Sequence, residues 1–257
     1  MTSAPASALP SVEAPLTEKS RLVYTLFSPS RTFADIRRNA SWWGPWLVVS
    51  VFSLLFAVTL NKVFNYEALI RSQIAHSKIA TEFPKMTQAQ QNAIIHLRTT
   101  AGHIAAYAVP VTSFIKGLIL AGFFLGVFNF LFKAAIPFSR SLAVVFYSML
   151  PSVVTHVLSF VELLRKGGDT SFNLRNPVPT NPAYFMNLGS SSSFTYGIAA
   201  AFDIVTIWML VLLGIGFAIN SENNKVSKAK GIAVVVLIYV LYKAIFLILE
   251  PRISAAL

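Results

Sequence analysis

Cysteine is absent from the 257 residues, which excludes disulfide bonds, thiol nucleophiles and thiolate metal sites. Charged residues are scarce, at 12% of the chain, whereas an ordinary soluble domain has about 25%. Hydrophobic residues make up 55%, and the mean hydropathy is +0.63. A soluble chain of this composition would lack the polar surface that water requires. The composition therefore predicts an integral membrane protein.

Acidic residues are the rarer of the two charge types, with 10 Asp and Glu against 21 Lys and Arg, and the formal net charge is +11. In a soluble domain this excess would suggest binding to nucleic acid. Here the basic residues lie mostly between apolar segments. We therefore expect them to meet a lipid bilayer with anionic lipids, and we predict no nucleic-acid partner.

Catalytic and metal-binding motifs are also missing. The chain contains no G-x-S-x-G, H-E-x-x-H, Walker A or G-x-G-x-x-G pattern. Ser113 and Lys116 match S-x-x-K, but companion motifs are absent, which favours a chance match. The histidines are scattered, and no nearby carboxylate completes a metal site; they are His76, His96, His103 and His156. We predict a protein that is not an enzyme and holds no cofactor.

Five apolar segments are long enough, or nearly so, for the ~20 residues of a membrane-spanning helix. We predict an all-α, polytopic membrane helix bundle, with one membrane domain over 45–257. Residues 1–18, rich in Ala, Ser and Pro without an apolar core, are predicted to be a disordered tail rather than a signal peptide. The predicted spans are 45–61, 108–132, 141–164, 198–219 and 231–249.

The polar segments between these spans have their own patterns. Residues 19–44 are basic and mildly amphipathic, and Ser28-Pro29 is typical of a helix start. Since Phe33 and Ile36 share one face, we expect an interfacial helix in the headgroup layer, with a solvated helix as the alternative. Between spans 1 and 2 we expect two extracytoplasmic helices, broken at Pro84. A capping box at Thr87–Gln90 introduces the second.

The loop segments bear on orientation. The segment 165–197 is rich in Gly, Pro, Asn and Ser and shows no periodicity, so it is predicted to be a long loop. The total number of Lys and Arg hardly differs between the two sides of the membrane. Two short loops, at 133–140 and 220–230, are densely basic, and short loops weigh most. This density predicts a cytoplasmic N-terminus and an external C-terminus.

Four charged side chains lie in or at the edge of the predicted spans, where each costs several kcal/mol if it faces lipid. They are Lys116, Glu162, Asp203 and Lys243. Asp203 and Lys243 fall at similar depth in consecutive spans, so we predict an ion pair between them. Such a cluster is typical of a polar pathway for a solute, or of a pair that fixes helix register.

Small residues recur at four-residue spacing in the second span, where they let helices approach closely in lipid. The pairs are Gly117 with Ala121 and Gly122 with Gly126. This spacing indicates tight helix packing, either within the chain or between two copies of it.

Three short stretches carry a family resemblance: Trp42-Trp43-Gly44-Pro45-Trp46 before the first span, Tyr147 to Pro151 in the third, and Asp203 to Trp208 in the fourth. The tryptophans are also expected to form an aromatic belt at the membrane interface. In their order and placement these stretches resemble the YIP family of Rab-GTPase-interacting membrane proteins, in particular its bacterial branch, over about residues 25–250. Ser41 stands where the family pattern has an acidic residue, and Phe146 stands where it has Gly.

The resemblance implies five spans with a cytoplasmic N-terminus, in a bacterial cytoplasmic (inner) membrane. Eukaryotic members of the family are implicated in vesicle trafficking and Rab binding. We predict a non-enzymatic membrane-organising, trafficking-like or scaffolding protein that binds other membrane proteins or a second copy of itself. The alternative is a small-solute or ion transporter or channel that uses the intramembrane charges.

Overall fold

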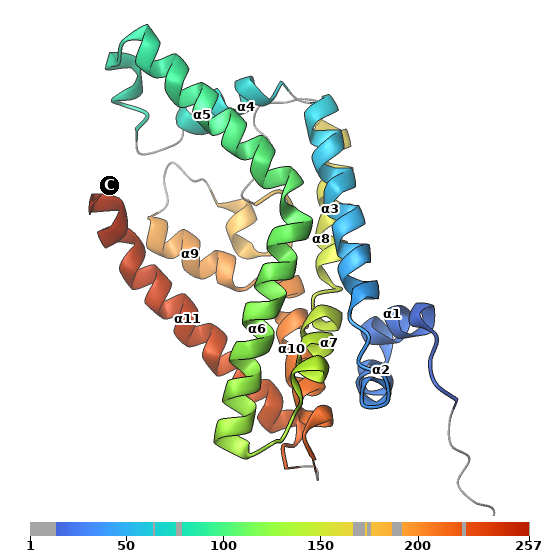
Figure 1. The fold of residues 1–257 in the computed structure, drawn as a ribbon. Coiled ribbons are helices and arrows are strands. Elements are labelled where there is room, and N and C mark those ends of the chain that lie inside the picture. Colours follow the sequence, from blue (N-terminus) through green and yellow to red (C-terminus); the bar gives the residue numbers. More distant parts are fainter. Residues whose placement is uncertain are drawn as a thin grey trace, which may run out of the picture.

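The computed structural model describes residues 14–63, 65–75, 79–166, 173, 176–186, 192–222 and 225–256, and every regular element in these ranges is a helix (Figure 1). Four segments are long and apolar enough to cross a bilayer. A fifth segment, built from α9 (Ser193–Ala201) and α10 (Ile204–Asn220), passes only as a pair bent by 54°. The predicted helical membrane bundle is confirmed. The four segments are Trp43–Val63 (α3), Val109–Phe132 (α6), Phe138–Lys166 (α7, Phe138–Ser148, with α8, Ser152–Lys166) and Lys228–Leu249 of α11 (Lys228–Ala256).

Breaks in two of the predicted spans follow from single residues. Pro151 separates α7 from α8, because proline lacks the N–H that an uninterrupted helix would need there. Asp203 separates α9 from α10, since its side chain accepts a 2.7 Å hydrogen bond from the Thr206 N–H and thereby starts a new helix. The fourth span is therefore not the straight helix over 198–219 that hydropathy predicts.

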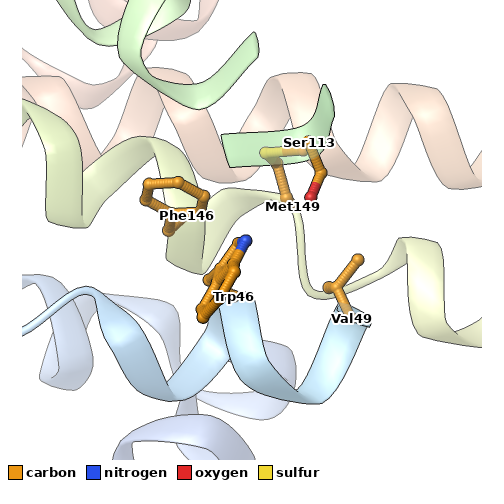
Figure 2. A pocket seen from close by; sticks show the side chains of 5 residues that line it. All are labelled: Trp46, Val49, Ser113, Phe146 and Met149. Carbon is orange, nitrogen blue, oxygen red and sulfur yellow. The ribbon is translucent and has the colours of Figure 1, made fainter. Parts of the chain in front are cut away.

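The position of α3 along the bundle axis, relative to α6, differs from the predicted one. Trp46 Nε1 donates a 3.0 Å hydrogen bond to the carbonyl of Pro110, in the first turn of α6. The sequence would place these residues at opposite membrane surfaces. Figure 2 shows the Trp46 ring beside Phe146 and Met149, inside the bundle. From Pro110, α6 continues for 22 residues to Phe132, about 30 Å at ~1.5 Å per residue. From Trp46, α3 runs in the opposite direction, beside α8 (Figure 1).

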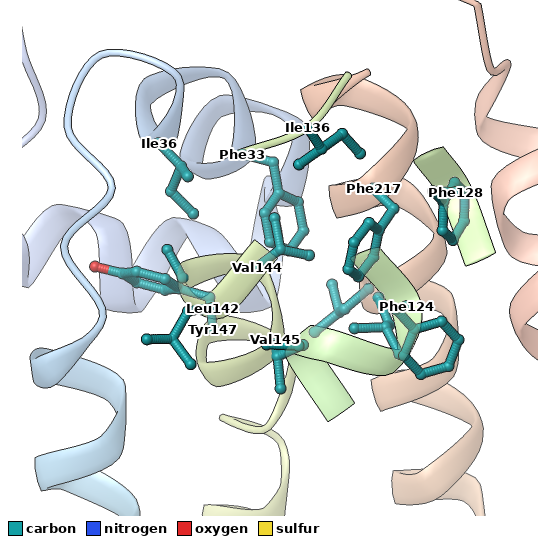
Figure 3. Packing of buried hydrophobic residues seen from close by; sticks show 14 of the residues in the cluster. Phe33, Ile36, Phe124, Phe128, Ile136, Leu142, Val144, Val145, Tyr147 and Phe217 are labelled. Carbon is teal, nitrogen blue, oxygen red and sulfur yellow. The ribbon is translucent and has the colours of Figure 1, made fainter. Parts of the chain in front are cut away.

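A helical hairpin occupies the end of the bundle below α3. It consists of α1 (Glu18–Phe27) and α2 (Pro29–Ile36), which begins at the predicted Ser28-Pro29. Phe33 and Ile36 are fully buried in the main hydrophobic cluster, among side chains of α7 and α10 (Figure 3). The expected contact of this apolar face with lipid is not found, because protein covers the face.

The boundary of the predicted N-terminal tail also changes. Residues 1–13 lie outside the described residues. The Leu16 N–H donates to Asp35 Oδ1 at 3.3 Å, and Thr17 caps α1 by accepting from the Ser20 N–H. The residues just before Lys19 are therefore part of the fold, although the sequence predicts them to be disordered.

The helical segment between the first two spans is confirmed. It contains α4 (Tyr66–Ala75), the short helix η1 (Phe83–Lys85) and α5 (Gln88–Tyr107). Both hydrogen bonds of the predicted capping box at Thr87 and Gln90 are present. Ile70 and Ile74 pack against Ile95 in a small separate cluster. Because only Ala108 separates α5 from α6, this segment continues almost directly into the second span.

The small residues of α6 divide between two faces. Gly117 lies against the Phe146 ring, and the Ala121 carbonyl accepts a 2.7 Å hydrogen bond from Ser141 Oγ. A methyl group at Gly122 or Gly126 would meet nothing within 4 Å. These two glycines therefore do not serve packing within the chain.

The closest backbone approach at a glycine lies elsewhere, between α10 and α11. A methyl group at Gly214 would meet backbone atoms of Gly231 and Ile232, and one at Gly231 would meet the Gly214 carbonyl. Neither glycine is one of the small residues at four-residue spacing in the second predicted span.

Candidate functional site

A buried polar network joins the hairpin to the bundle. Arg21 and Asp35 form an ion pair with 2.7 Å between Nε and Oδ2, and these residues are only 2% and 6% exposed. The Arg21 carbonyl accepts hydrogen bonds from the hydroxyls of Thr25 and Thr32, both fully buried. These contacts hold α1 against α2.

The same network reaches the rest of the protein through Glu18. Its Oε1 accepts a 2.6 Å hydrogen bond from the fully buried Tyr147 hydroxyl on α7, and its Oε2 lies 3.7 Å from Arg21 Nη1. Gly44 lies against the Glu18 side chain, so that a methyl group at Gly44 would overlap it. We call Glu18, Arg21, Asp35 and Tyr147 the hairpin network.

Burial and charge act in opposite directions on the pKa of Arg21 in the hairpin network. Burial alone would lower the pKa of Arg21, but its hydrogen bond and charge attraction to Asp35 raise it above the ordinary value. The guanidinium is therefore permanently charged and needs its carboxylate partner. The ion pair and hydrogen bonds of the network stabilise the packing of α1 against α2 and α7. The network offers no exposed nucleophile.

The tryptophan motif forms an aromatic contact beside this network. The Trp42 ring centroid lies 5.3 Å from that of Phe114 and 5.5 Å from that of Phe146. A small crevice next to it, lined by Trp46, Val49, Ser113, Phe146 and Met149, has no room for a water molecule (Figure 2). Trp43 is 53% exposed, whereas Trp42 and Trp46 pack against the main hydrophobic cluster. Only Trp43 thus fits the predicted aromatic belt.

Asp203 holds a loop against the break in the fourth span. Besides capping α10, it accepts a 2.5 Å hydrogen bond from the Thr180 hydroxyl, and the Ile204 N–H donates to the Thr180 carbonyl at 3.0 Å. Trp208, the other end of this motif, packs against the main hydrophobic cluster. Asp203 and Trp208 therefore both stabilise the fold: Asp203 by hydrogen bonds, and Trp208 by apolar packing.

The predicted ion pair between Asp203 and Lys243 is not among the ion pairs of the described residues. Instead, Lys243 Nζ lies 5.7 Å from the centroid of the Tyr239 ring. Asp203 is already engaged by Thr180 and by the N-terminal turn of α10. The prediction was wrong because it treated Asp203 as lying within a continuous helix rather than at a helix start.

The other two predicted intramembrane charges, Glu162 and Lys116, do not pair with each other. Glu162 pairs with Arg165 at 2.6 Å and Lys166 at 3.8 Å, and it accepts a 3.1 Å hydrogen bond from the hydroxyl of Tyr184, in the short helix η2 (Pro182–Phe185). Burial and this hydrogen bond raise the pKa of Tyr184. Lys116 is exposed on the outer surface of α6. No ion pair within the described ranges joins two of the four predicted charges.

A metal site does not arise from these side chains. In the part of the chain that the structure describes, no group of three or more His, Asp or Glu side chains could hold a metal ion. The residues that do converge are Glu18, Arg21 and Asp35, which no sequence motif marks. Their signal was weak, since Glu18 lies in the predicted tail and the two ion-pair partners are 14 positions apart.

Comparison with known proteins agrees with the arrangement of these motifs. No curated protein and no solved structure matches the chain. The profile of one family, the Yip1 domain, matches residues 23–249. This range contains α3 to α10 complete, with most of the hairpin and the spanning part of α11. The chain therefore belongs to the Yip1-domain family, a family of membrane proteins linked to trafficking.

Proposed function

We propose that the chain is a non-enzymatic membrane-organising protein, which acts by binding other membrane components. One observation carries this proposal. Each charged group that a solute pathway would use either contacts a side chain of its own helix or of the segment 176–186, or faces outward. Glu162 binds residues of its own helix, and Asp203 caps one helix and holds one loop.

The interior supports the same conclusion. The main cluster, which includes Phe128, Phe146 and Phe217, is apolar and joins the hairpin to α6, α7, α10 and α11 (Figure 3). Phe128 and Phe217 stack with 4.7 Å between ring centroids. A densely packed apolar interior opposes the passage of ions, because a charge inside it would be desolvated without a partner.

A second candidate function is transport of an ion or small solute, and the bent pair α9–α10 favours it. Discontinuous spanning helices line substrate sites in several transporter folds. In this arrangement, Asp203 and Thr180 at the break would contact the solute.

Proteoliposome flux separates the two candidates. Purified protein is reconstituted and assayed with a panel of ions and small solutes, alongside Asp203→Asn and the matched control Glu67→Gln, an exposed acid outside the spans. We expect flux no greater than in protein-free vesicles for all three proteins. Solute-specific flux that Asp203→Asn abolishes and Glu67→Gln keeps would contradict the organising function.

The cellular setting forms part of the proposal. We place the N-terminus in the cytoplasm, the C-terminus outside, and the chain in a bacterial cytoplasmic membrane. The support is the basic character of the connections from α6 to α7 and from α10 to α11, at Lys133, Arg140 and Lys228, since cytoplasmic loops and the adjoining span ends carry an excess of Lys and Arg. Its partners are other membrane proteins or a second copy of the chain.

A further inference from the structure

The hairpin has an outward face as well as a buried one. On α1, Val23 and Phe27 are 54% and 78% exposed and lie one helical turn apart. Lys19 lies one turn before Val23 on the same helix, Arg31 lies on α2, and both are exposed. The Arg31 guanidinium stacks over the Tyr24 ring at 4.4 Å. The exposed surface of the hairpin thus combines two apolar side chains of α1 with cations from both helices.

More cations surround the hairpin from neighbouring elements. Arg140 Nη2 donates to the Arg37 carbonyl at 3.2 Å, and Lys228 Nζ donates to Ser30 Oγ at 2.9 Å. Within the described ranges, none of Arg31, Arg37, Arg140 and Lys228 takes part in an ion pair with a carboxylate. No described carboxylate therefore neutralises their positive charge, which can attract an anionic partner.

The position of the hairpin identifies that partner. It lies beside the end of α10 and the start of α11, where Asn220 Nδ2 donates to the Phe33 carbonyl at 3.1 Å (Figure 1). Helices that cross a bilayer end at its surface, so the hairpin lies at headgroup depth. Apolar side chains and cations at this depth match acyl chains below phosphate groups.

We propose that the α1–α2 hairpin binds anionic lipid headgroups. Phe27 and Val23 insert at the boundary between headgroups and acyl chains, while Arg31, Arg37 and Lys228 contact lipid phosphates. This inference rests on the proposed organising function and deepens it, because it names anionic lipid as a partner. Lipid is favoured over an acidic protein because the hairpin contacts Arg140 and Lys228 at the first residues of spanning helices.

The depth of Phe27 can be measured directly, because the chain has no cysteine to replace before labelling. Phe27→Cys and the exposed α5 control Asn92→Cys are spin-labelled in full-length protein and placed in phosphatidylcholine–phosphatidylglycerol nanodiscs. We expect the label at position 27 to collide more with oxygen than with a water-soluble nickel complex, and the label at position 92 to do the reverse. Equal water exposure at both positions would overturn the insertion.

Lipid preference tests the cations. The double variant Arg37→Gln/Lys228→Gln is compared with Arg71→Gln/Lys85→Gln, which removes the same charge between the first two spans, and with the single variant Arg31→Gln. Retained phosphatidylglycerol is counted against phosphatidylcholine by native mass spectrometry. We expect a preference about five-fold weaker for each hairpin cation removed, the factor that corresponds to about 1 kcal/mol per basic residue at an anionic surface.

The outcomes separate this inference from the proposed function. Equal lipid preference in the wild-type chain and all folded variants would overturn the lipid site, even if proteoliposomes show no flux. Binding of an acidic peptide, lost in the hairpin variants without any change in lipid preference, would also overturn it and assign the surface to protein. Solute flux with intact lipid preference would contradict only the organising function.

Discussion

At the scale of single residues, the ion pair of Arg21 and Asp35 is the most consequential contact. Both side chains are removed from water, and each is the other's charged neighbour at hydrogen-bond distance. Breaking a buried pair by removing one charge is more damaging than replacing both charges, since the remaining charge has no partner and little hydration. The exposed pair of Glu67 and Arg71, at the similar distance of 2.8 Å, should matter far less.

We therefore expect Asp35→Asn to lower the free energy of unfolding by about 3–5 kcal/mol. The double variant Arg21→Met/Asp35→Leu should lose clearly less, because both charges of the buried pair are gone, while Glu18 is 24% exposed and keeps the hydrogen bond from Tyr147. Unfolding in mixed detergent micelles with increasing denaturing detergent measures both, and Glu67→Gln is the matched exposed control. If Asp35→Asn were as mild as Glu67→Gln, the buried ion pair would not be what holds the hairpin together.

The carboxylate of Glu18 also bears on the family pattern. That pattern has an acidic residue just before the tryptophans, where this chain has Ser41. Here a carboxylate from α1 lies against Gly44 and accepts the hydrogen bond of Tyr147. Two of the family motifs thus meet at one side chain that lies outside both motifs in sequence.

Asp203 provides a second test at this scale. We expect Asp203→Ala to destabilise by about 1 kcal/mol through the lost helix cap. A double-mutant cycle with Thr180→Val should give a coupling energy of at least about 0.5 kcal/mol, because these side chains are hydrogen-bonded. The cycle with Lys243→Met should give a coupling near zero. A larger coupling to Lys243 than to Thr180 would restore the ion pair that the sequence predicts.

At the scale of elements, the contact of α10 with α11 depends on glycine. The backbone of one helix occupies the space that a side chain at Gly214 would need. We expect Gly214→Ala to destabilise by about 1–3 kcal/mol through overpacking. Gly122→Ala is the matched control, since open space surrounds that position. Thermal unfolding in detergent compares them, and an equal effect of both substitutions would contradict the close approach.

Hydropathy and local motifs predict only some of these elements. The spans are recognisable because each depends on a run of apolar residues in its own segment. The capping box at Thr87 is equally local. The break at Asp203 is missed because the flanking residues are all apolar, so that one carboxylate decides between one helix and two. The outward direction of Gly122 is missed because spacing does not say which face meets a neighbour.

At the scale of the whole molecule, the hairpin shows what the sequence could not predict. Its amphipathic pattern is visible, but the partners of its apolar face are distant in sequence. Phe33 packs with residues of α7 and α10, and Asn220 bonds its carbonyl across 187 positions. From one sequence, an apolar face at a membrane surface can equally meet lipid or protein. The structure assigns the inner face to protein, and we assign the outer face to lipid.

Both proposals depend on the docking of this hairpin onto the bundle. Amide hydrogen exchange on full-length protein in lipid nanodiscs tests it most directly. We predict that the amides of α1 and α2 are protected to the same extent as those of α7, and that Asp35→Asn accelerates exchange in α1 and α2 first. If α1 and α2 exchanged within seconds in the wild-type protein while α7 stayed protected, the hairpin would not be docked, and the account would be contradicted.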